Sequence, residues 1–106
     1  MNYQKYEQGN KIAVLVSPGY GAGWSTWNTE YGAEALCMDA DLVQCVLDKD
    51  FDALIRVTEE KYPGVYCGGA RDVRVYWVDK GEAFEITEYD GNESLVVVSK
   101  RSYMIA

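Results

Sequence analysis

The sequence predicts an α+β fold: a small single domain with a mainly antiparallel sheet and two short helices on one face. Three observations lead to this prediction. The run KIAVLV at residues 11–16 is apolar, as expected of a strand. Residues 40–58 place apolar side chains at helical spacing. Residues 73–87 instead alternate apolar and polar side chains, which is the period of a strand with one buried face.

Length and composition indicate one domain, and the N-terminal part of the chain divides into three segments. A chain of 106 residues with 48% hydrophobic and 25% charged residues indicates one globular domain, 1–106, with no internal repeat or linker. Residues 1–10 form a polar lead-in with Tyr3 and Tyr6 as its anchors, and a glycine- and aromatic-rich loop occupies residues 17–32 after the first strand. The next segment, GAEALCMD at residues 32–39, is ambiguous between a short strand and a connector.

Two acidic residues mark the starts of two helices. Asp39 is a plausible N-cap for a helix over residues 40–48, and Asp50 or its neighbours begin a second one. Pro63–Gly64 ends the second helix. The apolar face comprises Leu42, Val43, Val46 and Leu47 in the first helix, and Phe51, Leu54, Ile55 and Thr58 in the second. The acidic residues expected to point outward as a solvated face are Asp39, Asp41, Asp48, Asp50, Asp52, Glu59 and Glu60.

The second half of the chain predicts an antiparallel meander. Strands are expected around residues 73–77, 84–87, 95–98 and 103–105. The turns between the first three are Asp79-Lys80-Gly81 and the stronger signal at residues 89–93, because Asp-Gly tolerates the positive φ of tight hairpins. The residues predicted to be buried in this sheet are Val14, Val75, Trp77, Phe84 and Ile86.

The segment SPGYGAGWSTWN at residues 17–28 is the strongest candidate for a binding site. Its glycines allow close approach to the backbone, and its aromatic rings offer flat surfaces with one polar tip each. The stacking candidates are Tyr20, Trp24 and Trp27, and the polar candidates are Ser25, Thr26 and Asn28. The alternative is a structural elbow in which the tryptophans fold back onto the sheet.

Known phosphate-binding loops match this segment poorly. Its spacing is GxGxG, one residue short of the dinucleotide fingerprint GxGxxG, and it lacks the GK[ST] ending of a P-loop. What remains is a set of amides and hydroxyls able to bind phosphate oxygens beside rings able to stack on bases.

Charge and missing residue types exclude several function classes. A formal net charge of −7 argues against general nucleic-acid binding, although acidity can serve solubility or can imitate nucleic acid toward a basic protein. The chain has no histidine, so histidine-based triads are impossible and a zinc site would lack most of its usual ligands. Cys37, Cys45 and Cys67 are interpreted as buried thiols in a reducing cytoplasm. No segment predicts a membrane span or signal peptide.

Three motifs together resemble a family of small, widespread phage-encoded proteins. They are VLVSPGYGAGWSTWN, CGG before a strand, and VRVYWVDKGEAFEITEYDGNESL, and the resemblance covers residues 11–95. The chain is similar to the phage anti-CBASS sponge proteins, which bind cyclic oligonucleotide immune signals without cleaving them and assemble as oligomers. The resemblance implies a non-enzymatic immune-evasion protein in the cytoplasm of an infected bacterium. It also implies a homo-oligomer with a cyclic nucleotide as ligand, and the residue types predict no metal or cofactor.

An anionic ligand requires cations, and few are present. The candidates are Arg71 and Arg74 near Gly68-Gly69, and Lys100-Arg101, although each is by default an ordinary surface charge. Tyr89 and Asp90, in the segment EYDGNES, complete the predicted ligand-binding set. That segment is either a simple hairpin turn or a source of acceptors for base amino groups, from Glu88, Asp90, Asn92 and Glu93. Its carboxylates do not have EF-hand spacing.

Two other function classes stay open. The acidic helices favour an inhibitor that presents a nucleic-acid-like face to a host nuclease or CRISPR effector. An enzyme that acts on a nucleotide through carboxylate and tyrosine groups is the third alternative, and the absence of histidine counts against it.

Overall fold

Strand β2 (Lys11–Val16) runs through the centre of the fold. It pairs antiparallel with β1 (Glu7–Gln8) on one edge and with β3 (Arg74–Asp79) on the other. In this computed structural model, which describes residues 3–19, 21–28 and 33–98, a separate antiparallel hairpin is formed by β4 (Phe84–Tyr89) and β5 (Asn92–Val97). The predicted α+β class with mainly antiparallel strands is confirmed.

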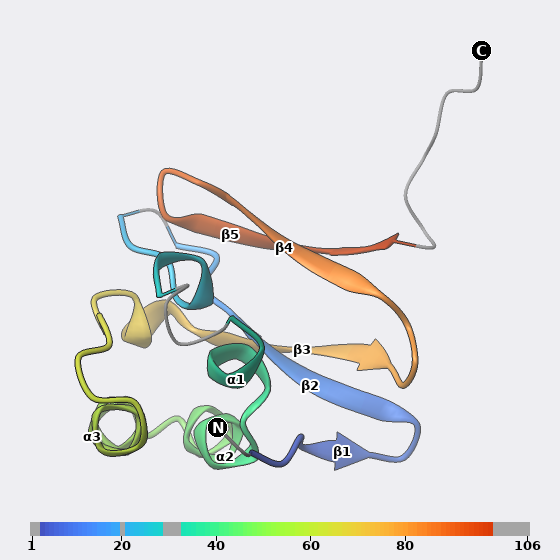
Figure 1. Cartoon of the computed structure of the whole chain (residues 1–106), viewed down its shortest axis with the longest axis horizontal. Helices are drawn as coiled ribbons and strands as arrows, with labels where there is room; N and C mark the ends of the chain where they lie inside the picture. Colours follow the sequence, from blue (N-terminus) through green and yellow to red (C-terminus); the bar gives the residue numbers. More distant parts are fainter. Residues whose placement is uncertain (1–2, 20, 29–32, 99–106) are drawn as a thin grey trace.

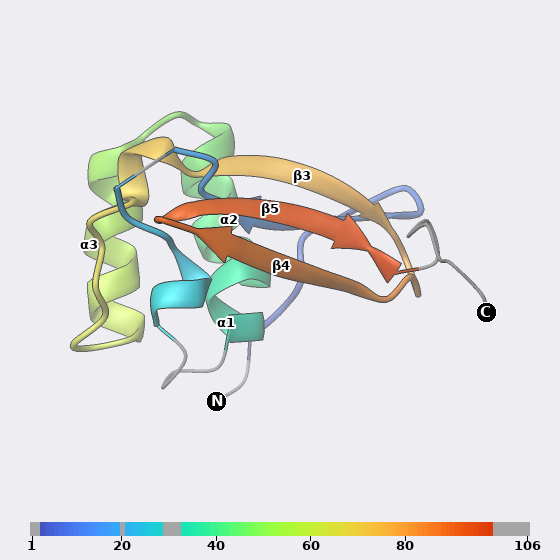
Figure 2. The same cartoon turned by 90° about the horizontal axis from the view of Figure 1, so that it is seen from above.

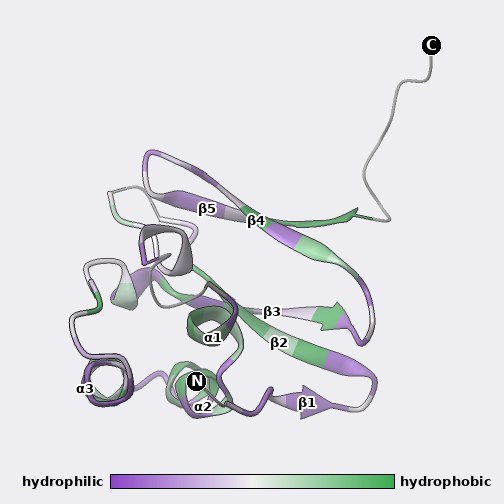
Figure 3. Ribbon diagram, in the orientation of Figure 1, coloured by the Kyte–Doolittle hydropathy of each residue, from purple (hydrophilic) through white to green (hydrophobic). Residues whose placement is uncertain are grey.

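Both faces of β2 are covered, so five of its six residues are buried. Ala13 and Leu15 point into a core cluster shared with helices α2 (Ala40–Leu47) and α3 (Phe51–Lys61). The other face of β2 packs against the β4–β5 hairpin through the cluster of Ile12, Val14, Val16 and Val78. Figure 1 shows these layers: α2 and α3 on one side of the sheet and the hairpin on the other. Seen from above in Figure 2, the hairpin lies in front of the helices, and Figure 3 shows hydrophobic residues concentrated along β2.

The two predicted helices are confirmed, and so are their caps. The carboxylate of Asp39 accepts a hydrogen bond from Asp41 N at 2.9 Å at the start of α2. The carboxylate of Asp50 accepts one from Ala53 N at 3.1 Å at the start of α3. These short-range contacts satisfy N–H groups that a helix leaves unpaired in its first turn.

A third helix, α1 (Ala33–Met38), occupies the segment for which the sequence predicted a short strand or a connector. That prediction was wrong because the segment is almost uniformly apolar and therefore shows neither a helical nor a strand period. Tertiary contact decides instead: Leu36 packs into the core with the helices, while Cys37 and Met38 pack on the hairpin side of β2.

The predicted meander is interrupted between β3 and β4. β3 pairs with β2 over six residues, and the described part of the chain contains no pairing between β3 and β4. The predicted turn forms, with Gly81 at a φ of 90° and Glu82 N donating to Asp79 O at 3.0 Å, but the chain then passes into the second layer. The Asp90-Gly91 turn is confirmed, with both residues at positive φ. The strand predicted at residues 103–105 lies outside the described residues.

The predicted core residues are only partly right. Val14 is fully buried, and Val75, Phe84 and Ile86 are half-buried. Trp77 is 39% exposed, contrary to the prediction, because the helical layer does not extend over its end of β3. Its ring instead meets the edge of Tyr6, with the ring centroids 6.1 Å apart. This contact and the partial burial of Tyr3 and Tyr6 anchor the polar lead-in.

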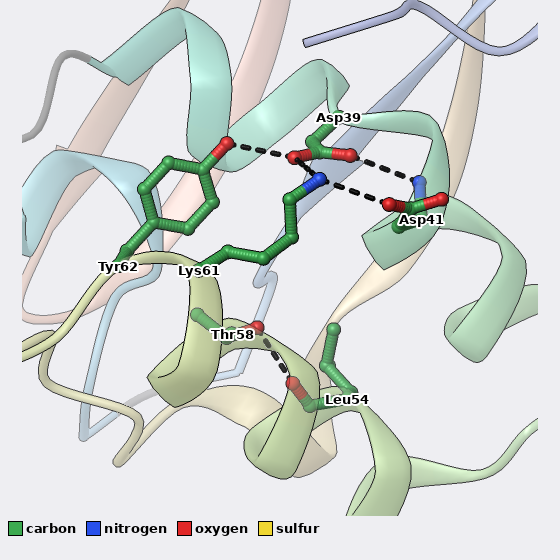
Figure 4. A network of polar contacts seen from close by, with 6 residues as sticks. All are labelled: Asp39, Asp41, Leu54, Thr58, Lys61 and Tyr62. Atoms are coloured by element: carbon green, nitrogen blue, oxygen red, sulfur yellow. Dashed lines mark hydrogen bonds and ion pairs between the residues drawn. The ribbon is translucent and has the colours of Figure 1, made fainter. Parts of the chain in front are cut away.

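Asp39 departs from the predicted acidic surface, because it is 1% exposed while the other six acidic residues of that set are exposed. Figure 4 shows its surroundings: its carboxylate accepts from Tyr62 Oη at 2.7 Å and forms an ion pair with Lys61 Nζ at 2.7 Å. Lys61 also pairs with Asp41 at 2.9 Å. Burial and the hydrogen bond to Asp39 raise the pKa of Tyr62. Asp39 therefore connects the start of α2 to the end of α3.

Replacing Asp39 should cost more than the loss of a helix cap. We expect Asp39→Ala to lower the free energy of unfolding by about 3 kcal/mol, since it removes a cap together with the buried hydrogen bond from Tyr62 and the ion pair with Lys61. Asp50→Ala, which removes a cap alone, should cost about 1 kcal/mol. Urea denaturation measures both. Equal costs for the two aspartates would contradict this account.

Candidate functional site

The carboxylate of Glu93 is the centre on which loop 17–28 is assembled. Its Oε1 accepts from Ser17 N at 2.9 Å, and its Oε2 accepts from Trp24 N at 2.6 Å. Oε2 also accepts from Thr26 N at 3.2 Å and from Thr26 Oγ1 at 2.6 Å. Because Glu93 is 1% exposed and its own N–H donates to Ser17 O at 2.8 Å, this strand residue closes both ends of the loop. Glu93 is therefore structural rather than an acceptor for a ligand.

Two glycines permit this close approach. A Cβ at Gly23 would lie 2.7 Å from Thr26 Oγ1 and 3.0 Å from Glu93 Oε2, which leaves no room for a side chain. Gly91 has a φ of 86°, and a Cβ there would lie 2.6 Å from Ala22 N. The absence of a side chain at these two glycines thus allows loop 17–28 and the β4–β5 turn to pack closely together.

Trp24 belongs to the core, which corrects its predicted role as a stacking surface. It is 0% exposed, and its Nε1–H donates to Leu36 O at 2.8 Å. A ring enclosed on all sides cannot stack on a ligand, so the structural-elbow alternative holds for this residue. It is the N-cap residue of the 3₁₀ helix η1 (Ser25–Trp27), and the Glu93 carboxylate accepts hydrogen bonds from Trp24 N and Thr26 N.

The predicted polar contacts of the loop are also internal. Asn28 is 2% exposed, and its Nδ2 donates to Trp24 O and Tyr66 O, both at 2.9 Å. Its Oδ1 accepts from Tyr66 N at 2.7 Å. Thr26 is bound to Glu93, and Ser25 is buried. The side chains of Thr26 and Asn28 therefore hold the loop together.

Trp27 is the predicted stacking residue that reaches the surface. It is 42% exposed and lies against Tyr66, itself 50% exposed, with ring centroids 5.7 Å apart and planes at 22°. We call Trp27 and Tyr66 the aromatic pair. Sequence reasoning missed Tyr66, although an aromatic residue two positions before Gly68-Gly69 was a usable signal.

The β4–β5 turn meets the loop beside the aromatic pair. Glu88 Oε2 accepts from Trp27 Nε1 at 2.9 Å and from Gly91 N at 2.9 Å, and these two bonds lower the pKa of Glu88. Asp90 binds the loop through its backbone, since its carbonyl accepts from Gly21 N at 3.1 Å. Tyr89 is 78% exposed and, by strand alternation, points to the opposite face of the hairpin from Glu88.

The structure holds both predicted arginines at the first turn of α3. Arg71, in the 3₁₀ helix η3 (Ala70–Asp72), donates to Asp52 at 2.6 Å. The guanidinium of Arg74 lies 5.8 Å from the centroid of the Phe51 ring. Both are exposed, and neither guanidinium is engaged with the aromatic pair in these contacts. Tyr20 and Lys100-Arg101 lie outside the described residues.

A separate groove of about 410 Å³ opens between β4 and the pair of helices η1 and α1. Apolar lining comes from Cys37, Met38, Ala83, Phe84 and Ile86, and charged lining from Lys5, Glu34, Glu82 and Glu85. Ser25 and Thr26 complete it. The buried Ser25 Oγ has no hydrogen-bond partner among the described residues, and such unpaired hydroxyls are uncommon in folded proteins.

The cysteines are unsuited to act as nucleophiles. Burial raises the pKa of the Cys37 thiol to about 12, and burial likewise raises the pKa values of Cys45 and Cys67. All three are free thiols, Cys37 buried and the others half-buried, and a thiol that stays protonated is a poor nucleophile. In residues 3–19, 21–28 and 33–98, no three histidine, cysteine or acidic side chains are grouped so as to hold a metal ion.

No protein-family model, curated protein or solved structure matches this chain. The resemblance therefore rests on the sequence motifs alone. Within the described part of the chain, no helix has the length and apolar character needed to cross a membrane.

Glu93 should be intolerant of even an isosteric change. Glu93→Gln replaces one acceptor oxygen by an amide donor that faces backbone N–H groups, so we expect a loss of about 3 kcal/mol in unfolding free energy. The matched control is Glu88→Gln in the same hairpin, whose exposed side chain should change stability far less. Chemical denaturation of both variants tests this, and equal losses would refute the central role of Glu93.

The bond between Trp27 and Glu88 should respond to acid. The pKa of Glu88 in the folded protein lies below its ordinary value of 4.5, so its stabilising effect is complete above pH 4.5 and is lost as the pH falls through the lowered value. We expect the Trp27 indole N–H resonance to move over this interval in NMR spectra. In Glu88→Gln the amide oxygen still accepts but does not titrate, so that resonance should stay in place. An identical shift in both proteins would contradict the assignment.

Proposed function

We propose that this chain is a non-catalytic binding protein that sequesters a small cyclic oligonucleotide, with the aromatic pair as its stacking surface. It would act in the cytoplasm of an infected bacterium as a phage immune-evasion protein, as its resemblance to the anti-CBASS sponge proteins implies. The observation that carries the proposal is the exposed, nearly parallel arrangement of Trp27 and Tyr66.

The position of the pair supports this proposal. The segments GYGAGWSTW and EYDGNES, which carry the resemblance, are more than 60 residues apart and meet through Glu93, Glu88 and the carbonyl of Asp90. Trp27 comes from the first segment and its indole is oriented by Glu88 of the second. A ring fixed in orientation loses little freedom when a base stacks on it, which favours binding.

Charge supports an oligomer as the binding form. Glu88 and Asp90 lie close to the aromatic pair, so a single chain offers an acidic rather than a basic setting to a phosphate. A second copy would bring cations such as Arg71 or Arg74 to the ligand and would enclose it, as a shallow surface on a small domain cannot. The proposed assembly is therefore a homo-oligomer.

Sequestration and turnover can be separated in one experiment. The protein is incubated with a panel of cyclic di- and trinucleotides, free ligand is measured after filtration, and the complex is then denatured by heat. We expect one ligand class to leave free solution and to return chemically unchanged. Recovery of a linear product would establish an enzyme, and no depletion across the panel would refute the proposal.

Tryptophan variants locate the site. Trp27→Ala should weaken binding by about 1–3 kcal/mol, the value of one stacked base, or about 5- to 150-fold in Kd. The control is Trp77→Ala, a similarly exposed tryptophan of β3 that contacts Tyr6 instead, and this variant should bind as the unmodified protein does. Isothermal titration measures both. Equal affinity of the two variants would remove the aromatic pair from the site.

A second candidate function is favoured by the acidic face of α2 and α3. Its exposed carboxylates are Asp41, Asp48, Asp50, Asp52, Glu59 and Glu60. Such a face suits an inhibitor that occupies the basic nucleic-acid channel of a host nuclease or CRISPR effector. Binding to a purified nuclease that weakens steeply with salt, together with no nucleotide binding, would favour this function.

A further inference from the structure

The outer edge of β3 is open to pairing. β3 is hydrogen-bonded to β2 along one side, and no strand of the described residues 3–19, 21–28 and 33–98 pairs along the other. Seen from above in Figure 2, β3 lies along the back margin of the molecule, at the top of the view. Its central residues 75–78, VYWV, carry no charge, proline or bulge, which are features that keep natural edge strands from pairing with other chains.

The peptide groups of two β3 residues point out of this edge. Lys80 N donates to Asn10 O at 2.8 Å, and these two residues continue the β2–β3 register by one position. Because hydrogen-bonded pairs alternate along an antiparallel ladder, the even-numbered residues of β3 bond to β2. The N–H and C=O groups of Val75 and Trp77 therefore point outward, and no hydrogen bond joins them to another described residue.

Apolar side chains flank the same edge. Trp77 is exposed and lies opposite Ala13 in the register, so it projects from the face of the sheet that α2 and α3 cover. On that face a hollow of about 380 Å³ opens between the end of α2 and the start of β3. Its lining includes the apolar residues Val46, Leu47, Phe51 and Val75 and the cations Lys49 and Arg74.

We propose that two copies of this chain pair through β3 as an antiparallel dimer with twofold symmetry. Val75 of each copy lies opposite Trp77 of the other, so every outward N–H and C=O group of these residues gains a partner. At each end of the pairing, the exposed Asp72 of one copy approaches Lys80 of the other, so opposite charges meet.

The peptide groups select this register over its neighbours. A shift by one residue would set an outward-facing group against an inward-facing one. A shift by two residues in one direction would place Trp77 opposite Val73, whose N–H is already bonded within η3. A shift by two in the other direction would place Val75 opposite Asp79, whose carbonyl already accepts a hydrogen bond in the turn after β3.

The same register brings a tryptophan to each hollow. Residues directly opposite in a ladder have their side chains on the same face, so Trp77 of one copy lies beside Val75 of the other. There the indole packs against Leu47 and Phe51, with the cations of the lining near its ring. Because the symmetry repeats this contact, both exposed tryptophans of the dimer are covered.

This interface is separate from the proposed nucleotide site. The 3₁₀ helix η1, which carries Trp27, is drawn in cyan in Figure 2 and lies in front of the hairpin, whereas β3 lies behind it. Pairing through β3 leaves the aromatic pair of each copy exposed and requires no nucleotide. Failure of either proposal therefore leaves the other untouched.

A single introduced cysteine tests the register. Tyr76 lies opposite itself across the twofold axis, in a pair that is not hydrogen-bonded. The Cα atoms of such a pair are about 4.5 Å apart, a separation that a disulfide spans. With Cys45 and Cys67 replaced by serine, we expect Tyr76→Cys to form a disulfide-linked dimer when it is oxidised with copper phenanthroline, as seen on non-reducing gels.

Arg74→Cys is the matched control in the same background. It lies on the same face of the same strand and is also exposed, but its two copies are about 14 Å apart along the paired strands. It should therefore stay monomeric on the gel. Equal crosslinking of the two variants would indicate random collision and would overturn the proposal, as would the absence of a crosslinked dimer from Tyr76→Cys.

Sedimentation equilibrium over a dilution series measures the assembly without an oxidant. We expect twice the mass of one chain for the unmodified protein. Val75→Pro should give a monomer, since it removes an outward N–H and leaves the hydrogen bonds between β3 and β2 in place. Circular dichroism shows whether this variant is folded.

Leu47→Lys tests the hollow without changing the strand. It should raise the Kd of the dimer about tenfold, because a charge replaces an apolar contact of the incoming indole. Tyr89→Lys makes the same change of charge at an exposed residue of β4 and should leave the Kd unchanged. A monomeric unmodified protein, or equal effects of the two lysine variants, would refute pairing through β3.

Discussion

The buried carboxylate of Glu93 is the interaction on which the arrangement of the loop and the hairpin depends. The carboxylate accepts hydrogen bonds from the backbone N–H groups of Ser17, Trp24 and Thr26 and from the Thr26 hydroxyl. A single side chain therefore supplies the hydrogen-bond acceptors that the glycine-rich loop cannot supply to itself. A charged acceptor with this many donors is stable in the interior, because each bond is charge-assisted and few lone pairs stay unsatisfied. Without this carboxylate, the backbone N–H groups of Trp24 and Thr26 would lose their acceptor on the hairpin.

Coverage of β2 on both faces explains why the chain divides into three layers. Because alternate side chains of one strand enter two different clusters, helices and hairpin cannot compete for the same face. The hairpin must then leave the plane of the sheet after β3, and the residues that line its inner face meet loop 17–28 and α1. The aromatic pair and the β4–α1 groove are both consequences of this displacement.

Features that depend on near neighbours could be predicted from the sequence, and those that depend on distant contacts could not. The caps Asp39 and Asp50, the helices that follow them and the Asp90-Gly91 turn are encoded within a few residues. The helical state of α1 and the exposure of Trp77 depend on which layer covers them. The burial of Asp39 depends on Tyr62, which directly follows α3. Glu93 looked like any other turn carboxylate, because its donors lie about 70 residues away.

The predicted site divides into buried residues that hold the loop and exposed rings that a ligand can reach. Trp24 and Trp27 are three residues apart in one motif, yet one is enclosed and bonded to α1 while the other is exposed and bonded to Glu88. A substitution at Trp24, Asn28 or Thr26 removes internal bonds, so a loss of binding there would report unfolding of the loop rather than loss of a contact. Only the exposed rings can be truncated while Glu93 keeps its donors. Evidence about a ligand must therefore come from the aromatic pair, whatever the motif as a whole suggests.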